Sequence, residues 1–469
     1  NHPRILYRAC QPETASPKLL VSKSTADRKT PYVNHSLVTR NRVLYIAWPI
    51  ILSNISTPLL GLVDTAVIGN LGDPTLIGAI AIGSMIFSFL YWGFGFLRMG
   101  TTGLVSQARG SGDETEAKAA FYRAFLTGVF IGLVLLALQA PIATLAFSII
   151  EGSDAVEKAA LTYMQIRIWG APLSLSYLAI IGYLLGQQDT RAILILQFLL
   201  NFVNIILDFV FVVGLGFDVA GIAAATVIAE SLALFAGLAM VITRIRKGHG
   251  GLAINADRLK DAQALKRMFV VNRDIMIRTL CLIFAFAWFT NEGAKSGDIL
   301  LATNAILMQF VTFSAFFLDG FALAAESLVG NAIGAKNKQQ IKVSIRYTTE
   351  LGLATAALVS TCFVLVGGPV TDILTNVVEV RESARIYLPW VVAAPIVSVW
   401  CYLLDGIFIG ATRTREMRNA MIVSLFFYML FWWLLVDLYA NHGLWASLML
   451  YFISRALTLS YYLPRLISQ

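Results

Sequence analysis

The sequence has few charged residues for its length. Asp, Glu, Lys and Arg make up 14% of the 469 residues, and 57% of the residues are hydrophobic. Soluble domains carry roughly 25% charged residues. Apolar runs longer than about 18 residues recur along the chain, which is typical of a polytopic, all-α membrane protein. The runs do not alternate with period two, which argues against a transmembrane barrel.

Cysteine and histidine are also scarce. The four cysteines are scattered without CxxC spacing, and the four histidines all lie in the N-terminal tail or in predicted loops. There is no GxxxxGK[ST] motif for ATP binding. These absences predict that the chain is not an enzyme and has no cofactor or metal framework.

The net charge of +8 raises the question of nucleic-acid binding. Lys and Arg are concentrated in alternate predicted loops, as the positive-inside rule requires. We therefore expect a lipid bilayer and no nucleic acid as partner. The same bias predicts a multi-pass protein of the inner or plasma membrane with both termini in the cytoplasm. We expect a monomer.

Residues 1–40 are polar and basic and show no hydrophobic periodicity. They contain no apolar core typical of a cleaved secretory signal. We interpret them as a disordered leader or a sequence added for expression; an organelle-targeting peptide is an alternative.

Twelve helical spans are predicted after the leader. An N-terminal six-helix lobe covers residues 41–246, a cytoplasmic connector covers 247–272, and a C-terminal six-helix lobe covers 273–469. The spans are roughly 43–67, 75–104, 119–149, 158–186, 191–215, 219–246, 274–292, 298–331, 342–371, 384–411, 417–440 and 442–465.

An internal repeat supports this division. The segment LVSQARG at 104–110 resembles LVGNAIG at 328–334, and GYLLGQQDTR at 182–191 resembles GIFIGATRTR at 406–415. Both pairs have an offset of 224 residues, obtained as 328 − 104 and 406 − 182. Six helices are therefore duplicated in the same orientation around a central cavity, an arrangement found in secondary transporters.

Several polar residues lie deep in the predicted spans of the first lobe. Asp64 interrupts an apolar segment, and a charge at membrane depth costs about 2.5–3.5 kcal/mol on insertion scales. At 1.5 Å per residue, Asp64, Asp208 and Thr226 are at a similar depth, roughly 10 Å below the outer surface. Asn201 and Asn204 share one helix face with Asp208, and Glu230 shares a face with Thr226.

Two carboxylates brought together at this depth would repel each other and be poorly solvated. Such a pair can share a proton near neutral pH. It can also hold Na⁺ with amide and hydroxyl oxygens as further ligands, which makes Asp64, Asn204, Asp208 and Thr226 a possible Na⁺ site. The alternative is a static hydrogen-bonded group that fixes helix packing.

The second lobe does not repeat these residues. Asp319 and Asp405 are candidates for the substrate cavity or for secondary coupling, together with Glu230 of the first lobe. Glu326 is expected to pair with Arg98, and Arg278 is expected to extend toward the membrane surface. Pro49 is expected to kink the first span, either for movement or for packing.

Five segments of the chain resemble the DinF branch of the multidrug and toxic compound extrusion (MATE) family. They are PLLGLVDTAVIG (58–69), FLRMGTTGL (96–104), NRDIMIR (272–278), LDGFA (318–322) and WCYLLDGIFIGATR (400–413).

The resemblance runs from about Val43 to Arg465 and implies two six-helix lobes that export organic compounds against a proton or sodium gradient. It further implies that Asp64, Asn204, Asp208 and Thr226 form the coupling site and that Pro49 is the kink proline. The fourth-helix Asn of some relatives has no counterpart here; Ser174 and Ser176 are the nearest polar residues.

The sequence therefore predicts a cation-coupled antiporter that exports amphipathic, often cationic, small organic compounds by alternating access. A flippase for a lipid-linked precursor, built on a related two-lobe fold, is the alternative. Its cavity should be lined with Lys or Arg, and few are found within the predicted spans. A membrane enzyme would need a nucleophile–base or metal constellation, which the sequence does not offer.

Overall fold

The computed structural model describes residues 38–69, 73–149, 153–247, 251 and 256–468. The predicted leader, residues 1–40, lies almost wholly outside these residues. Within them the chain is helical and contains no strand.

The first half contains helices α1 to α9. They are α1 (Arg40–Gly69), α2 (Pro74–Gly93), α3 (Phe96–Gly110), α4 (Glu114–Ala137), α5 (Gln139–Ile149), α6 (Asp154–Arg167), the 3₁₀ turn η1 (Ile168–Gly170), α7 (Ala171–Gly186), α8 (Thr190–Asp208), the π-helical turn η2 (Phe209–Gly214) and α9 (Asp218–Lys247).

The second half contains a short helix and five long ones. They are α10 (Ala256–Leu259), α11 (Ala262–Lys295), α12 (Asp298–Gly334), α13 (Lys338–Leu374), α14 (Val378–Gly410) and α15 (Thr414–Ile467). The backbone leaves the helical conformation at Ala440, so α15 consists of two helices.

The helices in the described part of the chain form twelve segments, each of them long enough to run through the bundle. Nine are long and apolar enough to cross a membrane; α1, α11 and the division of α15 account for the others. Each predicted span overlaps one of these segments, and the span at 119–149 continues from α4 into α5. Helix α11 begins at Ala262, inside the segment predicted as a connector at 247–272. Asp261 caps this start by accepting from the backbone N–H of Gln263.

The backbone confirms the internal repeat. Gly112 and Lys336 both have positive φ, at 75° and 51°. The next residue in each half, Asp113 or Asn337, caps the following helix by accepting from a backbone N–H three residues on. These positions are again 224 residues apart, so both halves use the same turn to enter the same helix.

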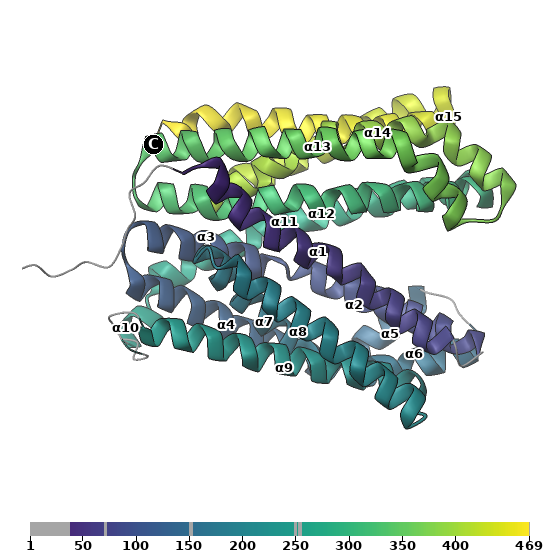
Figure 1. The fold of residues 1–469 in the computed structure, drawn as a ribbon, viewed down its shortest axis with the longest axis horizontal. Helices are drawn as coiled ribbons and strands as arrows, with labels where there is room; N and C mark the ends of the chain where they lie inside the picture. The colour runs from purple at the N-terminus through teal and green to yellow at the C-terminus, as the bar shows by residue number, and fades with distance from the viewer. Residues whose placement is uncertain (1–37, 70–72, 150–152, 248–250, 252–255, 469) are drawn as a thin grey trace, which may run out of the picture. The chain divides into compact units, whose positions relative to one another are not determined.

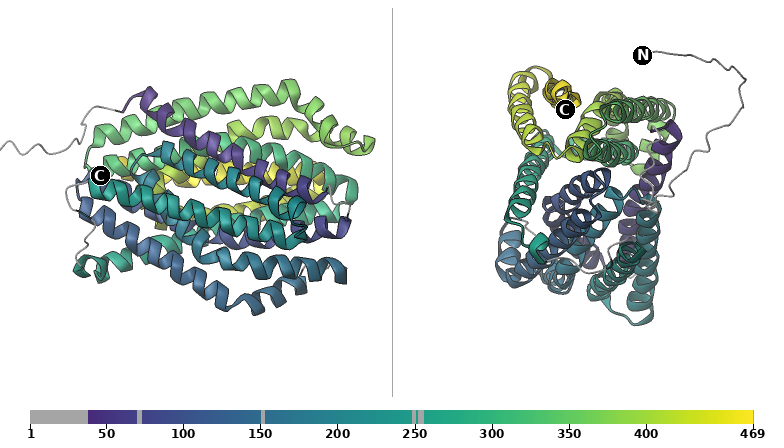
Figure 2. Two further views of the ribbon diagram at one scale, coloured as in Figure 1. Left: turned by 60° about the horizontal axis from the view of Figure 1, so that its bottom comes forward. Right: turned by 90° about the vertical axis from the view of Figure 1, so that its left-hand side faces the viewer.

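The helices gather into two lobes. In the first, α3 and α4 pack on α7, and α1 packs on α8; in the second, α12, α13 and α14 pack together, and α11 packs on α15. Figure 1 shows the second-lobe helices α12 to α15 on one side and α4, α7, α8 and α9 on the other, with α1 between them. Figure 2 shows the same two groups from the end of the bundle.

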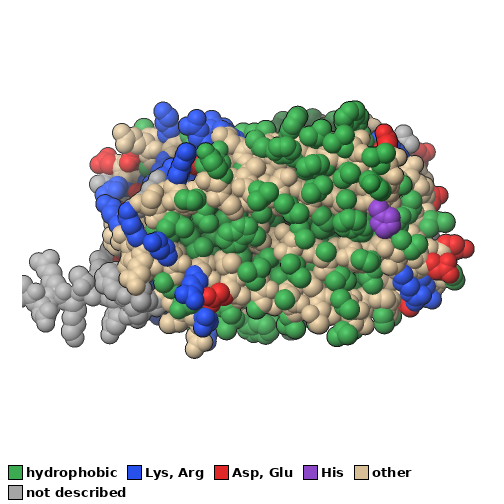
Figure 3. All heavy atoms as spheres, turned by 90° about the horizontal axis from the view of Figure 1, so that it is seen from above, with side chains coloured by type: hydrophobic (Ala, Val, Ile, Leu, Met, Phe, Trp, Pro, Cys, Tyr) green, Lys and Arg blue, Asp and Glu red, His purple; other side chains and the backbone are tan. Residues whose placement is uncertain are grey.

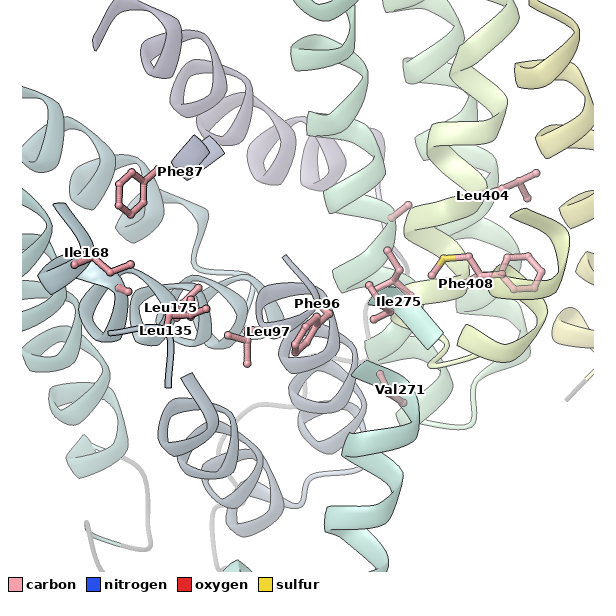
Figure 4. Packing of buried hydrophobic residues seen from close by; sticks show 14 of the residues in the cluster. Phe87, Phe96, Leu97, Leu135, Ile168, Leu175, Val271, Ile275, Leu404 and Phe408 are labelled. Atoms are coloured by element: carbon pink, nitrogen blue, oxygen red, sulfur yellow. The ribbon is translucent and has the colours of Figure 1, made fainter. Parts of the chain in front are cut away.

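A continuous apolar core joins the lobes. Figure 4 shows Phe96 of α3 near Ile275 of α11, with Leu97 and Leu175 on one side and Phe408 on the other. All of these side chains are buried. The apolar contact between the lobes is therefore made by α3, and α1 adds a second contact on α12.

The outer surface matches a bilayer. Large apolar side chains such as Ile373, Leu438 and Leu365 are exposed. In Figure 3 hydrophobic side chains spread over the middle of the face that is seen. Lys and Arg gather toward the end where the chain terminates, and acidic groups are more frequent at the other end. We call the Lys/Arg-rich end the basic end. The surface is that of an integral, multi-pass membrane protein.

Candidate functional site

Two carboxyl groups meet inside the first lobe. Asp64 of α1 and Asp208, the last residue of α8, lie within hydrogen-bonding distance of each other. Asp208 is completely buried, and its Oδ1 has no hydrogen-bond partner. The π-helical turn begins directly after Asp208; such turns interrupt the regular backbone ladder and are frequent at functional sites. Two carboxylates this close repel each other, and a proton or a cation between them would relieve the repulsion.

Asn204 and Thr226 complete this group. In the orientation of the Asn204 amide that satisfies both of its ends, the nitrogen donates to Asp208 Oδ2 (3.3 Å) and the oxygen accepts from the backbone N–H of Thr226 (3.2 Å). The Thr226 hydroxyl donates to the carbonyl of Ile222 (2.9 Å). The structure therefore brings together Asn204 and the three residues that the sequence analysis placed at one depth, which are Asp64, Asp208 and Thr226. We call them the carboxylate cluster.

Asn201 lies outside the cluster and joins two helices. Its amide nitrogen donates to the carbonyl of Ser56 on α1 (3.0 Å), and its oxygen accepts from Gln197 (3.1 Å). It thereby holds α1 against α8 two helical turns before Asp64. Helix α1 runs through Pro49 and Pro58 as one element.

Glu230 is engaged by an arginine that the sequence analysis missed. Arg167, at the end of α6, binds both of its carboxylate oxygens (2.8 and 2.5 Å), and the Ser174 hydroxyl donates to the same carboxylate. The guanidinium also lies over the rings of Phe87 and Tyr91. A charged residue inside an apolar span was the available signal, because such a group needs a buried partner.

In the second lobe, Asp405 of α14 is held between two arginines. Arg278 of α11 and Arg455 of α15 both donate to its Oδ2, Arg455 at 2.6 Å. The expectation that Arg278 reaches the membrane surface was wrong: its side chain is 7% exposed, because Asp405 supplies a buried counter-charge. Arg455 was missed, since the spacing of residues along one helix does not reveal partners on another.

A cavity of about 600 Å³ lies between the lobes. Both lobes contribute apolar side chains to its wall, among them Ile50, Ile181, Leu282, Phe286 and Tyr402. Five charged side chains reach the wall, and they are Arg98, Arg278, Asp319, Glu326 and Asp405.

These charges are arranged in opposite pairs. Arg98 faces Glu326 at 3.6 Å, which confirms the predicted pairing, and Arg278 is bound to Asp405. Asp319 interacts with both arginines over a longer range. The sequence analysis underestimated the arginines in the cavity, but each of them faces an acid.

The lobes are in close contact at the basic end. Glycines at repeat-related positions make this possible: Gly110 of α3 packs on the backbone of Asn331, and Gly334 of α12 packs on the backbone of Gln107. A Cβ at either glycine would overlap the opposing carbonyl oxygen. The amide of Gln107 also donates to the carbonyl of Gly410 on α14 (2.9 Å). The lobes therefore touch backbone to backbone at this end.

Two lobes of six helices, an internal repeat and a cavity at their interface define a secondary transporter of the membrane. Comparison with known proteins specifies the family. The MatE family model matches residues 49–210 and 275–434, and the chain belongs to this family of multidrug efflux transporters.

The chain is 42% identical to DNA damage-inducible protein F of Escherichia coli (strain K12), over 89% of this chain and 90% of that protein. It is 24% identical to the probable multidrug resistance protein NorM of Thermotoga maritima, over 74% of this chain and 75% of that one.

The structure resembles one described as the outward-facing conformation of a multidrug resistance MATE family transporter of the MOP superfamily. The TM-score is 0.84, with 16% identity, over 92% of this chain and 96% of that one. The predicted family, fold class and membrane character are thereby confirmed, and the chain is a transporter and not an enzyme.

Proposed function

We propose that this transporter exports amphipathic, cationic organic compounds in exchange for a proton or Na⁺, and that the carboxylate cluster is its ion-coupling site. The observation that carries the proposal is the buried contact between Asp64 and Asp208. Isolated buried carboxylates are costly in a bilayer. A role in binding and releasing an ion during transport would explain why the protein keeps two carboxyl groups there.

The cluster has the donors and acceptors that either ion needs. A single proton shared between the two carboxyl groups removes one negative charge from the buried pair. A Na⁺ ion would instead be held by carboxylate oxygens with the amide oxygen of Asn204 and the hydroxyl oxygen of Thr226, since hard cations prefer oxygen ligands. Both modes neutralise charge on α1 and α8 together, which allows the two helices to move as a unit.

The cavity is the proposed substrate site. Aromatic residues such as Phe286 and Tyr402 offer stacking surfaces to flat organic cations. Asp319 is the cavity acid without a close arginine partner in the described structure, so we assign it as the counter-charge for the substrate. Glu230 and Asp405, each bound by arginine, are assigned to structural support of their lobes.

Alternating access links the two sites. With the cavity open away from the basic end, the cluster takes up an ion and the substrate leaves. The lobes then separate at the basic end, the ion is released and new substrate enters. We assign the basic end and both termini to the cytoplasm, following the positive-inside rule. Ion coupling requires that the ion bind one state more tightly, and a tenfold preference is about 1.4 kcal/mol.

The flippase alternative is less favoured. A lipid-linked pyrophosphate would need arginines free to receive it. Arg98 and Arg278 line the cavity but face Glu326 and Asp405.

The proposal is tested by substrate efflux from proteoliposomes, with a proton gradient and a Na⁺ gradient imposed separately. The wild type should transport an organic cation with one gradient, and Asp64→Asn should not transport it. Asp437→Asn, which changes an exposed acid of the second lobe, is the control and should transport normally. Folded wild-type protein that responds to neither gradient would refute the coupling assignment, as would an active Asp64→Asn variant.

A further inference from the structure

Two ion pairs link the lobes in the described part of the chain, and they differ in environment. Arg40 of α1 and Glu350 of α13 form an exposed pair, with side chains 59% and 34% exposed. Arg98 of α3 and Glu326 of α12 form a buried pair, with Glu326 1% exposed. Exposed ion pairs contribute little to stability because water and salt screen them, so the buried pair has the larger effect on the contact between the lobes.

The buried pair lies between the cavity and the close contact of α3 with α12. Both of its side chains line the cavity. Toward the basic end the same two helices, α3 and α12, pack together through Gly110 and Gly334. Any movement that opens the basic end must pull α3 from α12 and so separate Arg98 from Glu326.

Glu326 is poorly satisfied in this position. Among the described residues, neither of its carboxylate oxygens has a hydrogen-bond partner within 3.5 Å, and neither does Arg98 Nη1. Thr102 lies close by on α3, but its hydroxyl donates to the carbonyl of Arg98 (2.9 Å). The carboxylate is therefore held mainly by its attraction to Arg98, across a contact of 3.6 Å. A buried ion pair with such a long contact offsets its desolvation cost poorly, so a proton on Glu326 competes well with the attraction to Arg98.

The charged surroundings of Glu326 come from three other helices and its own. Arg98 on α3 is its partner, Asp319 lies on α12 itself, and Arg278 on α11 and Asp405 on α14 line the same cavity. The cavity-lining residues of α1 and α7 are uncharged. Because Arg278 and Asp405 are bound to each other, Arg98 is the group that keeps Glu326 ionised.

We propose that Glu326 is a second proton-coupling residue, which locks the two lobes together through Arg98 until it takes up a proton from the cavity. Protonation removes the attraction between α3 and α12 and releases the basic end. When that end is open, Glu326 faces the other side and loses the proton there, and the pair re-forms as the lobes close. The inference deepens the proposed function, since it assumes that the lobes alternate, and it specifies the proton for this step.

The proposal is tested by measuring the separation of the lobes at the basic end. Spin labels are placed at Thr115 on α4 and Gln339 on α13, both exposed, in a full-length chain whose four cysteines are replaced by alanine. Pulsed dipolar spectroscopy then gives the ratio of open to closed molecules at pH 7.5 and pH 5.5. In the wild type this ratio should rise at the lower pH.

Glu326→Gln imitates the protonated acid. It should raise the open fraction at pH 7.5, with an open-to-closed ratio about tenfold higher, equivalent to about 1.4 kcal/mol, and should abolish the response to pH. Arg98→Gln should open the lobes similarly, and the double variant should add little, because both changes break one interaction. Glu350→Gln, which removes the exposed inter-lobe pair, is the matched control and should behave as the wild type.

Two results would overturn the proposal: an unchanged distance distribution in both Glu326→Gln and Arg98→Gln, or a pH response that persists in Glu326→Gln. The distance measurement is independent of substrate. If the wild type transports nothing but Glu326→Gln still opens the lobes, the proposed function fails and the lock stands.

Discussion

The two lobes share a backbone plan but differ in how they treat buried charge. In the first lobe Asp64 and Asp208 face each other. In the second lobe a single acid, Asp405, is bound by Arg278 and Arg455. An acid with permanent counter-charges is fixed in one state, whereas two acids in contact change state whenever an ion arrives or leaves. The comparison teaches that duplication preserved the scaffold while the buried acids of the two lobes acquired different partners.

The difference between the lobes is tested most strongly by replacing one buried acid in each lobe, Asp208 in the first and Asp405 in the second. Asp208→Asn should abolish gradient-driven efflux, because a single carboxyl group no longer has a partner with which to share the ion. The variant should nevertheless fold, since Asn keeps the shape and a hydrogen-bonding oxygen. Efflux from proteoliposomes and thermal unfolding in detergent measure the two effects. Full activity in Asp208→Asn would show that the pair is structural.

Asp405→Asn should have the opposite outcome. It leaves two buried guanidinium groups without a counter-charge, and breaking a buried pair in this way costs about 3–5 kcal/mol. We expect a large fall in the unfolding temperature and a low yield of folded protein. Asp437→Asn is again the control. If the Asp405→Asn protein is as stable as the wild type but has lost transport, Asp405 takes part in coupling and is not a structural residue.

The repeat-related glycines offer a subtler comparison. Gly110→Ala and Gly334→Ala each place a methyl group against an opposing carbonyl, and overpacking of this kind costs about 1–3 kcal/mol. Because the contacts are related by the repeat, the two variants should shift the lobes toward the open basic end by similar amounts, as read by the spin-label distances. Gly368→Ala on α13, where the described structure leaves space for a methyl group, should have no such effect. A shift in one variant alone would show that the interface is asymmetric.

The smallest expected effect concerns the caps that begin α4 and α13. Asp113→Ala and Asn337→Ala each remove a side chain that accepts from a backbone N–H, a loss of about 1 kcal/mol. Thermal unfolding should show equal, modest decreases for the two variants. Markedly unequal values would mean that the two halves of the repeat do not use their shared turn in the same way.

The sequence predicts the fold well because hydropathy and loop charge respond directly to the bilayer. Twelve spans and the 224-residue repeat required no tertiary information. The breaks within spans were not predictable: the π-helical turn after Asp208 and the kink at Ala440 depend on backbone hydrogen bonds that have no local sequence signature.

The candidate site divides in the same way. Counting residues from the loops placed Asp64, Asp208 and Thr226 at one depth, and the structure brings them together. Ion pairs between helices were harder to foresee. Arg167 with Glu230 and Arg455 with Asp405 depend on the rotation of each helix about its axis, which spacing along one helix does not fix.

The central claim is that ion binding at the carboxylate cluster is coupled to substrate binding in the cavity, so that each weakens the other. The most direct measurement is the dependence of substrate Kd on proton and Na⁺ concentration for the purified wild type and Asp64→Asn. The account predicts that Kd of the wild type rises with one ion, by up to about tenfold for each tenfold increase, and that Asp64→Asn binds substrate with a Kd independent of both. A wild-type Kd independent of both ions, or an ion dependence that survives in Asp64→Asn, would contradict it.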